Sequence, residues 1–140
     1  MGLASAVDHC FATQFSSVKL SELAIGIGPF VVGPSIERKI GLSAFSQLTI
    51  NATGWQTAQW AKEKGLFAEI YDSAEEMDAA IQILTEKLAS SNPKSMQGLK
   101  KIMWEGTDHW DKLLKERAEI SGKRVLSNFT RKTIEKLSNT

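Results

Sequence analysis

Glu22 is the residue in this sequence whose type and setting best suit acid–base chemistry. It lies in residues 21–29, where its other neighbours are small or apolar and glycines at positions 26 and 28 precede a proline. A carboxylate among apolar neighbours must be paired, hydrogen-bonded or shifted in pKa, because burying an uncompensated charge is costly. Carboxylates in such settings transfer protons in many active sites, whereas others only stabilise the fold. Local sequence leaves both interpretations of Glu22 open.

The remaining reactive side chains do not form a recognisable site. His9 and His109 are far apart and lack the spacing of metal ligands, so we expect no metal. Cys10 is the single cysteine, which excludes a disulfide framework and a cysteine-rich zinc site. We expect Cys10 to be a small buried apolar residue, since no neighbouring base indicates a nucleophile. The glycines show no phosphate-binding loop and are expected in turns and close packing.

Composition describes an ordinary globular domain. The chain has 140 residues, of which 42% are hydrophobic and 24% charged, with a formal net charge of +1. The near-neutral charge gives no basic field for nucleic acid. No apolar run approaches the roughly 20 residues of a membrane span, and the first residues lack the features of a signal peptide. We therefore expect a cytoplasmic protein with no nucleic-acid or membrane partner.

The first 54 residues carry most of the glycines and predict short, mixed elements. The run of small residues at 2–7 predicts a packed helix. At 20–27, large and small residues alternate as in a buried strand or tight loop. Gly33 and Pro34 predict that the following helix begins or kinks there. The expected elements are a helix at 2–7, a strand at 8–12, a connection at 15–18, a strand or loop at 20–27, and helices at 30–39 and 43–50.

From residue 55 onward the sequence predicts mainly helices. A helix at 57–64 is closed by Gly65, and alternation at 66–71 predicts a strand. Ser73 and Glu76 form a capping box, which predicts the start of an amphipathic helix. Asn92 with Pro93, Asp108 and Ser127 predict the starts of three more helices. So few strands have too few partners for an independent sheet, which indicates that strands from elsewhere complete it.

Several of these segments together resemble the enoyl-CoA hydratase/isomerase (crotonase) family, in the C-terminal half of its subunit. The strongest match is residues 21–29, preceded by Asp8 at the family's spacing. Residues 36–41 and 57–67 match further family segments. The resemblance implies an α/β fold: the C-terminal part of a crotonase (ClpP-like) β–α spiral, with a few short strands followed by helices. It implies a partial spiral core at 1–72 and a C-terminal helical oligomerisation region at 73–140.

The resemblance also implies a reaction. Family members process enoyl-CoA thioesters by hydration or double-bond isomerisation, with an enolate stabilised in an oxyanion hole and with no cofactor beyond the CoA of the substrate. The two family glutamates match Gly2 and Glu22, so Glu22 is the catalytic acid/base that the resemblance implies. A single carboxylate fits isomerisation better than hydration, and other family reactions stay open. Both oxyanion-hole segments are expected outside this chain, and a homo-oligomer, a trimer or hexamer, is expected.

Other interpretations remain. The chain could be a non-catalytic crotonase-like fragment that acts as a packing or interaction module, or an unrelated helical regulator that matches by coincidence. Trp104 and Trp110 fit core packing, a subunit interface or a substrate tunnel. Basic side chains near the C-terminal end fit either a solvated helix face or a contact with CoA phosphates; they are Lys123, Arg124, Arg131, Lys132 and Lys136.

Overall fold

The centre of the fold is α2, a helical span with one break. In the computed structural model, which describes residues 1–138, α2 runs from Gly33 to Ile50. Pro34 lies in its first turn, where the fixed φ of proline suits a helix start. Gly41 breaks the helix with φ 77° and ψ 160°, a conformation that a side chain at this position would strain. The span of α2 is therefore two helical segments that meet at Gly41, in agreement with the predicted pair of helices.

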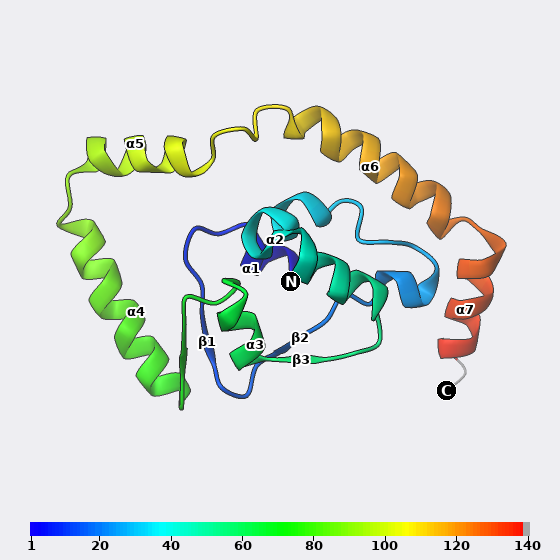
Figure 1. Cartoon of the computed structure of the whole chain (residues 1–140), viewed down its shortest axis with the longest axis horizontal. Helices are drawn as coiled ribbons and strands as arrows, with labels where there is room; N and C mark the ends of the chain where they lie inside the picture. Colours follow the sequence, from blue (N-terminus) through cyan, green and yellow to red (C-terminus); the bar gives the residue numbers. More distant parts are fainter. Residues whose placement is uncertain (139–140) are drawn as a thin grey trace.

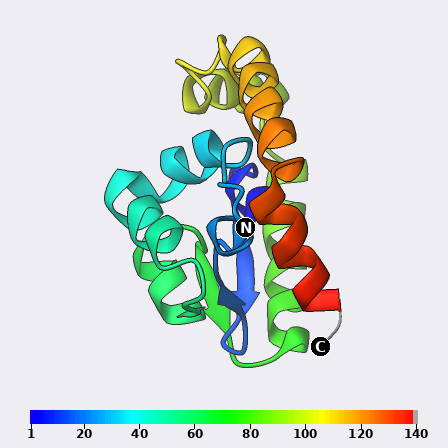
Figure 2. The ribbon, with the colours of Figure 1, turned by 90° about the vertical axis from the view of Figure 1, so that its right-hand side faces the viewer.

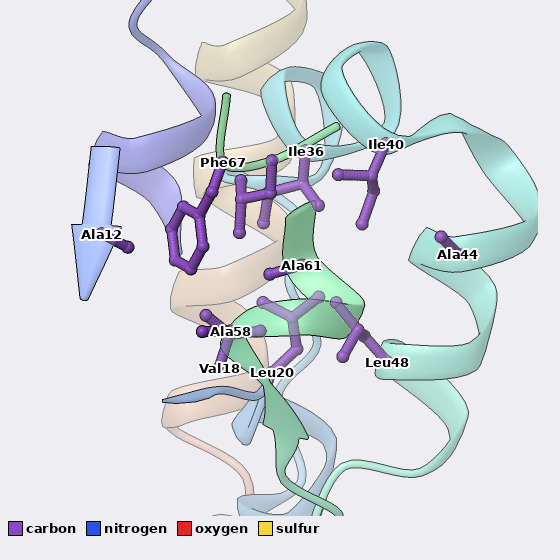
Figure 3. Close-up of a cluster of buried hydrophobic side chains, with 11 residues drawn as sticks. Ala12, Val18, Leu20, Ile36, Ile40, Ala44, Leu48, Ala58, Ala61 and Phe67 are labelled. Carbon is purple, nitrogen blue, oxygen red and sulfur yellow. The ribbon is translucent and has the colours of Figure 1, made fainter. Parts of the chain in front are cut away.

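One face of α2 is buried, and it carries the core. Ile36 and Ile40 lie one turn apart before Gly41, Ala44 and Leu48 lie one turn apart after it, and all four belong to one buried cluster. Figure 3 shows these side chains facing the side chains of α3 (Ala58–Glu63) and the segments around it. The other members of the same buried cluster are Ala12, Val18, Leu20, Ala58, Ala61, Leu66 and Phe67.

The strands form two small sheets. β1 (Phe11–Thr13) pairs in parallel with β4 (Glu69–Tyr71), and β2 (Ser17–Val18) pairs antiparallel with β3 (Gln56–Thr57). Helix α4 (Ala74–Ala89) contacts both β1 and β4. Figure 2 shows the strands between α2 and α3 on one side and α4 on the other. The strands are two or three residues long, in agreement with the prediction of few, short strands.

Helices α4 to α7 form an arc around the core (Figure 1). Ser73 accepts a hydrogen bond from the Glu76 amide, as the capping box predicted, and Asn92 accepts from the Lys94 and Ser95 amides. The predicted cap at Asp108 is wrong, because the N-cap of α6 is the next residue, His109, and it makes no side-chain cap bond. The three helices after α4 are α5 (Pro93–Met103), α6 (Trp110–Val125) and α7 (Asn128–Ser138).

Some predicted boundaries near the N-terminus were wrong. α1 is only Gly2–Ser5, and the strand expected at 8–12 begins at Phe11 instead. Residues 20–27 form no strand but contain a single 3-10 turn, η1 (Glu22–Ile25), so the tight-turn alternative holds. Within residues 1–138, none of the helices has the length and apolar character needed to cross a membrane.

A polar contact connects α5 to the core. The Asp8 carboxylate accepts hydrogen bonds from Lys100 Nζ at 2.6 Å and from Trp104 Nε1 at 2.5 Å. Arg38 of α2 stacks on the Trp104 ring, with its guanidinium carbon 4.5 Å from the ring centroid. Lys39 Nζ donates to the backbone carbonyls of Val7 and Asp8, at 3.0 and 2.9 Å. The hydrogen bond from Lys100, then that from Trp104, lowers the pKa of Asp8.

The buried side chains of α2 predict a large effect of core truncation. Ile36 is fully buried, so Ile36→Ala should lower the free energy of unfolding by about 3 kcal/mol through lost burial and a residual cavity. Leu42 on the same helix is 63% exposed, and Leu42→Ala should cost no more than about 0.5 kcal/mol. Urea denaturation measures both. Equal costs would contradict the packing described for α2.

The Asp8 contact predicts a pH-dependent difference between two chains. Asp8→Asn removes the charge that Lys100 and Trp104 bind, and should lower the free energy of unfolding by about 1 kcal/mol because the contact is partly exposed. The folded-state pKa of Asp8 lies below its ordinary value of 3.8, so this contribution is present above that value and lost below it. Wild type and Asp8→Asn should therefore differ at pH 7 and converge as the solution becomes more acidic than the lowered pKa. A difference that is the same at all pH values would contradict the role of the Asp8 charge.

Candidate functional site

Glu22 is positioned by the turn η1, which it begins. The amides of Ala24 and Gly26 donate to the carbonyls of Ser21 and Leu23, at 3.1 and 3.0 Å. The Ile27 amide donates to the Glu22 carbonyl at 3.0 Å and closes the turn. Gly26 ends it with φ 80°, in the left-handed region that glycine adopts without strain. The glycine seen in the sequence is therefore needed for backbone geometry.

The Glu22 carboxylate has one buried oxygen without a partner. Its side chain is partly buried, and Oε2 is shielded from solvent while no group among residues 1–138 donates a hydrogen bond to it. Most buried polar atoms in proteins are hydrogen-bonded, because desolvation without a partner costs free energy. The acceptor position of this oxygen is therefore unused by the fold of residues 1–138. This feature distinguishes Glu22 from a carboxylate that stabilises the fold through an ion pair.

The position matched to the other family glutamate, Gly2, is closely approached by the side chain of Val32. A Cβ on Gly2 would lie 3.0 Å from Cγ1 of Val32, so a larger residue would have to displace that side chain. α1 is held against α2 here, because the hydroxyls of Ser5 and Ser35 hydrogen-bond at 2.9 Å. η1 also contacts α2. In this chain, Glu22 is the acid at the two matched positions, and Gly2 packs on α2.

The hydrogen bonds and ring contacts described for the other reactive residues, His9, Cys10 and His109, do not involve Glu22. His9 makes an edge-to-face contact with Phe11, with ring centroids 4.7 Å apart. Burial raises the pKa of the Cys10 thiol, which keeps it protonated and unsuited to nucleophilic attack at neutral pH. His109 lies at the start of α6. Among residues 1–138, no three His, Cys, Asp or Glu side chains are grouped so that they could hold a metal ion.

The tryptophans and the basic cluster lie on the helical arc. Trp104 and Trp110 meet edge to face with centroids 6.0 Å apart, and Trp104 also binds Asp8. These contacts join α5 and α6 to the core, whereas an interface or tunnel role stays a prediction. The basic cluster is exposed at the end of α6 and along α7, in agreement with a solvated helix face; its members are Lys123, Arg124, Arg131, Lys132 and Lys136.

The family comparison decides the identity of this fold. Residues 1–136 match the family model described as enoyl-CoA hydratase/isomerase. The chain belongs to the enoyl-CoA hydratase/isomerase family. That match covers nearly the whole chain and includes Glu22, Gly26 and the arc of helices. Comparison with curated proteins gives no match.

Solved structures agree with the family at the level of the fold. An enoyl-CoA hydratase from Mycobacterium avium superposes with a TM-score of 0.89 at 23% identity, over 99% of this chain and 54% of that one. An enoyl-CoA hydratase/isomerase from Pseudoalteromonas atlantica gives 0.87 at 16% identity, over 99% and 56%. A carnitinyl-CoA dehydratase from Mycobacterium avium gives 0.76 at 21% identity, over 95% and 53%.

These matches confirm the crotonase fold that the sequence predicted. The chain spans about half the length of the matched crotonase structures. At these identities the likeness defines the fold and not the reaction. The division at residue 72 into a spiral core and an oligomerisation region, and the catalytic role of Glu22, stay predictions.

The unpartnered oxygen of Glu22 predicts that Glu22→Gln stabilises the fold, whereas most substitutions destabilise a protein. Glu22→Gln removes a partly buried negative charge while keeping the shape of the side chain, so it should raise the free energy of unfolding by about 1 kcal/mol. Glu119 is exposed on α6, and Glu119→Gln should change the free energy of unfolding by less than about 0.5 kcal/mol. Thermal and urea denaturation of the two variants measure the difference. A marked loss of stability in Glu22→Gln would mean that the carboxylate makes a stabilising bond in the fold.

Proposed function

We propose that this chain carries the acid–base carboxylate, Glu22, of an enzyme that acts on an enoyl-CoA thioester. The observation that supports the proposal is the buried, unpartnered oxygen of Glu22, presented by a glycine-closed turn in a member of the enoyl-CoA hydratase/isomerase family. A carboxylate in this state has a proton-accepting oxygen that no hydrogen bond among residues 1–138 uses. No cofactor other than the CoA of the substrate is needed for this chemistry.

The reaction we propose is the movement of a double bond by one carboxylate. Glu22 removes a proton from a carbon activated by the thioester, and the electron pair moves toward the thioester oxygen to give an enolate. The same carboxyl group then returns the proton to another carbon of the same conjugated system, and the double bond is displaced. Atoms and charge balance, since the proton that is removed is the proton that is returned.

The environment of Gly2 favours isomerisation over hydration. Hydration requires a water molecule to be activated and a proton to be delivered, for which the family generally uses two carboxylates. Gly2 has no side chain and Val32 occupies the neighbouring space, so this chain contributes one carboxylate. Hydration by a site with a differently placed second acid is the alternative reaction.

Stabilisation of the enolate depends on groups beyond Glu22. Two backbone N–H donors of an oxyanion hole are expected in the family, and loss of one such donor costs about 10²–10³ in rate. The matched crotonase structures are about twice as long as this chain, so we place these donors in the other half of the fold. We further place the assembled enzyme in the cytoplasm as an oligomer that acts in fatty acid metabolism.

A non-catalytic role is favoured by a different observation. Large apolar side chains are exposed on several elements, including Leu3 at 89%, Phe15 at 80% and Ile50 at 77%. Exposed apolar area of this kind is typical of surfaces that bind another polypeptide. An interaction module that keeps the crotonase fold without turnover would show the same surface, so activity measurements must distinguish the two functions.

The proposed function predicts a loss of turnover on neutralising Glu22. In a polypeptide that joins this chain to the first half of a crotonase subunit, Glu22→Gln should lower kcat for enoyl-CoA isomerisation by about 10²–10⁴, because general acid–base catalysis is removed. The matched control is Glu119→Gln, which should leave kcat unchanged. A spectrophotometric assay of the conjugated thioester follows the reaction. Undiminished turnover in Glu22→Gln would exclude Glu22 as the acid/base, and no turnover in the parent polypeptide would favour the interaction module.

A further inference from the structure

We propose that helix α7 holds the Glu22 turn in position, with Phe129 and Thr130 acting as positioning residues more than 100 positions away in the sequence. The catalytic consequence of this contact rests on the proposed function, because it assumes that Glu22 carries the proton. The contact itself does not depend on that function. It is a property of the packing between α7 and η1.

The contact is centred on Gly26, the residue that closes the turn. A Cβ at Gly26 would overlap Cδ1 of Phe129 and would lie 2.8 Å from Cε1 of the same ring. The same Cβ would lie 3.0 Å from the hydroxyl oxygen of Thr130. The backbone of η1 therefore lies directly against the first turn of α7, and no side chain fits between them. Gly26 thus has two separate requirements, its φ of 80° and this close approach.

The first turn of α7 is built to make this contact. Thr130 is fully buried and is the one residue of α7 described as buried, although threonine is mostly exposed in proteins. Its amide donates to the Ser127 hydroxyl at 3.3 Å, and the two hydroxyls hydrogen-bond at 3.1 Å. The buried Thr130 therefore fixes the capped start of α7 against the core.

Hydrogen bonds transmit the position of Gly26 to Glu22. The Gly26 amide donates to the Leu23 carbonyl, and the next amide, Ile27, donates to the carbonyl of Glu22 itself. A displacement of Gly26 therefore stretches or breaks bonds that set the backbone of Glu22. η1 is a single turn and is too short to be stable without tertiary contacts. The contacts with α7 and α2 supply this support.

Hydrogen exchange on the 140-residue chain tests the contact without any assay of activity. Phe129→Ala should accelerate exchange of the Gly26 and Ile27 amides about tenfold, because local opening of η1 becomes easier. Leu137 is the matched control, since it lies on the same helix and its exposure of 63% nearly equals the 64% of Phe129. Leu137→Ala should leave these two amides unchanged. Equal effects of the two variants, or no effect of Phe129→Ala, would overturn the inference.

A double-mutant cycle tests the close approach directly. Gly26→Ala should be destabilising both because of its positive φ and because the new methyl group overlaps the Phe129 ring. In the Phe129→Ala background the φ penalty remains but the overlap is removed, so the loss of stability from Gly26→Ala should be smaller. Additive effects of the two substitutions on the urea midpoint would mean that the ring does not lie against Gly26, and would overturn the inference.

Kinetics of the joined polypeptide then test the catalytic consequence. Phe129→Ala should lower kcat about tenfold with KM unchanged, since a misplaced acid/base slows the proton transfer without removing substrate contacts. Phe129→Tyr keeps the ring and should restore kcat. If Phe129→Ala accelerates exchange in η1 and Glu22→Gln leaves turnover intact, the anchoring stands and the proposed function fails. If Glu22→Gln abolishes turnover but Phe129→Ala changes neither exchange nor kcat, the proposed function stands and the anchoring is wrong.

Discussion

The burial of one face of α2 determines where both segments of the candidate site lie. Ile36, Ala61 and Leu66 have no exposed surface and belong to one cluster that joins α2, α3 and the segment after α3. α1, which carries Gly2, and η1, which carries Glu22, both contact α2. Because protein interiors are closely packed, a change at this cluster displaces its neighbours. The placement of the only carboxylate at the two family positions is therefore a consequence of the packing of α2.

The arc of helices is attached to this core in a different way. α4 packs on β1 and β4, whereas α5 is joined to the core through the Asp8 carboxylate. α7 returns to the core at η1, where Gly26 allows the side chains of Phe129 and Thr130 to approach the η1 backbone closely. The attachment of the arc thus combines a partly exposed ionic contact, which depends on pH and salt, with a steric contact, which does not. The steric contact is the one next to Glu22.

Exposed apolar residues connect the fold with its proposed function. Leu99, Ile102 and Leu126 are more than half exposed on the arc. Exposed apolar side chains that gather in one patch can bind further polypeptide. The matched crotonase structures, of which this chain covers about half, show how much further structure the fold can include. The same completion would supply the oxyanion donors that we place outside this chain.

Local sequence patterns determined the elements that depend on neighbouring residues. The cap at Ser73, the start at Pro93, the stop at Gly65 and the separation of the helices at 30–39 and 43–50 were predicted because capping, φ restriction and periodicity act over a few residues. The resemblance around Glu22 also predicted the family, which the comparison confirmed. Strand limits were not predicted, since pairing partners and not local propensity decide them. The 3-10 form of η1 was not predicted either, because a single turn depends on its tertiary contacts.

Tertiary structure alone decided which distant residues meet. Asp8 binds Lys100 and Trp104, which lie 92 and 96 positions further along the chain, and Gly26 lies against Phe129. No periodicity or motif in one sequence encodes such pairs, because they arise from the path of α4 to α7 around the core. The unpartnered state of the Glu22 oxygen belongs to the same class. A sequence can place a carboxylate in an apolar segment, but whether that carboxylate finds a donor depends on every element that folds around it.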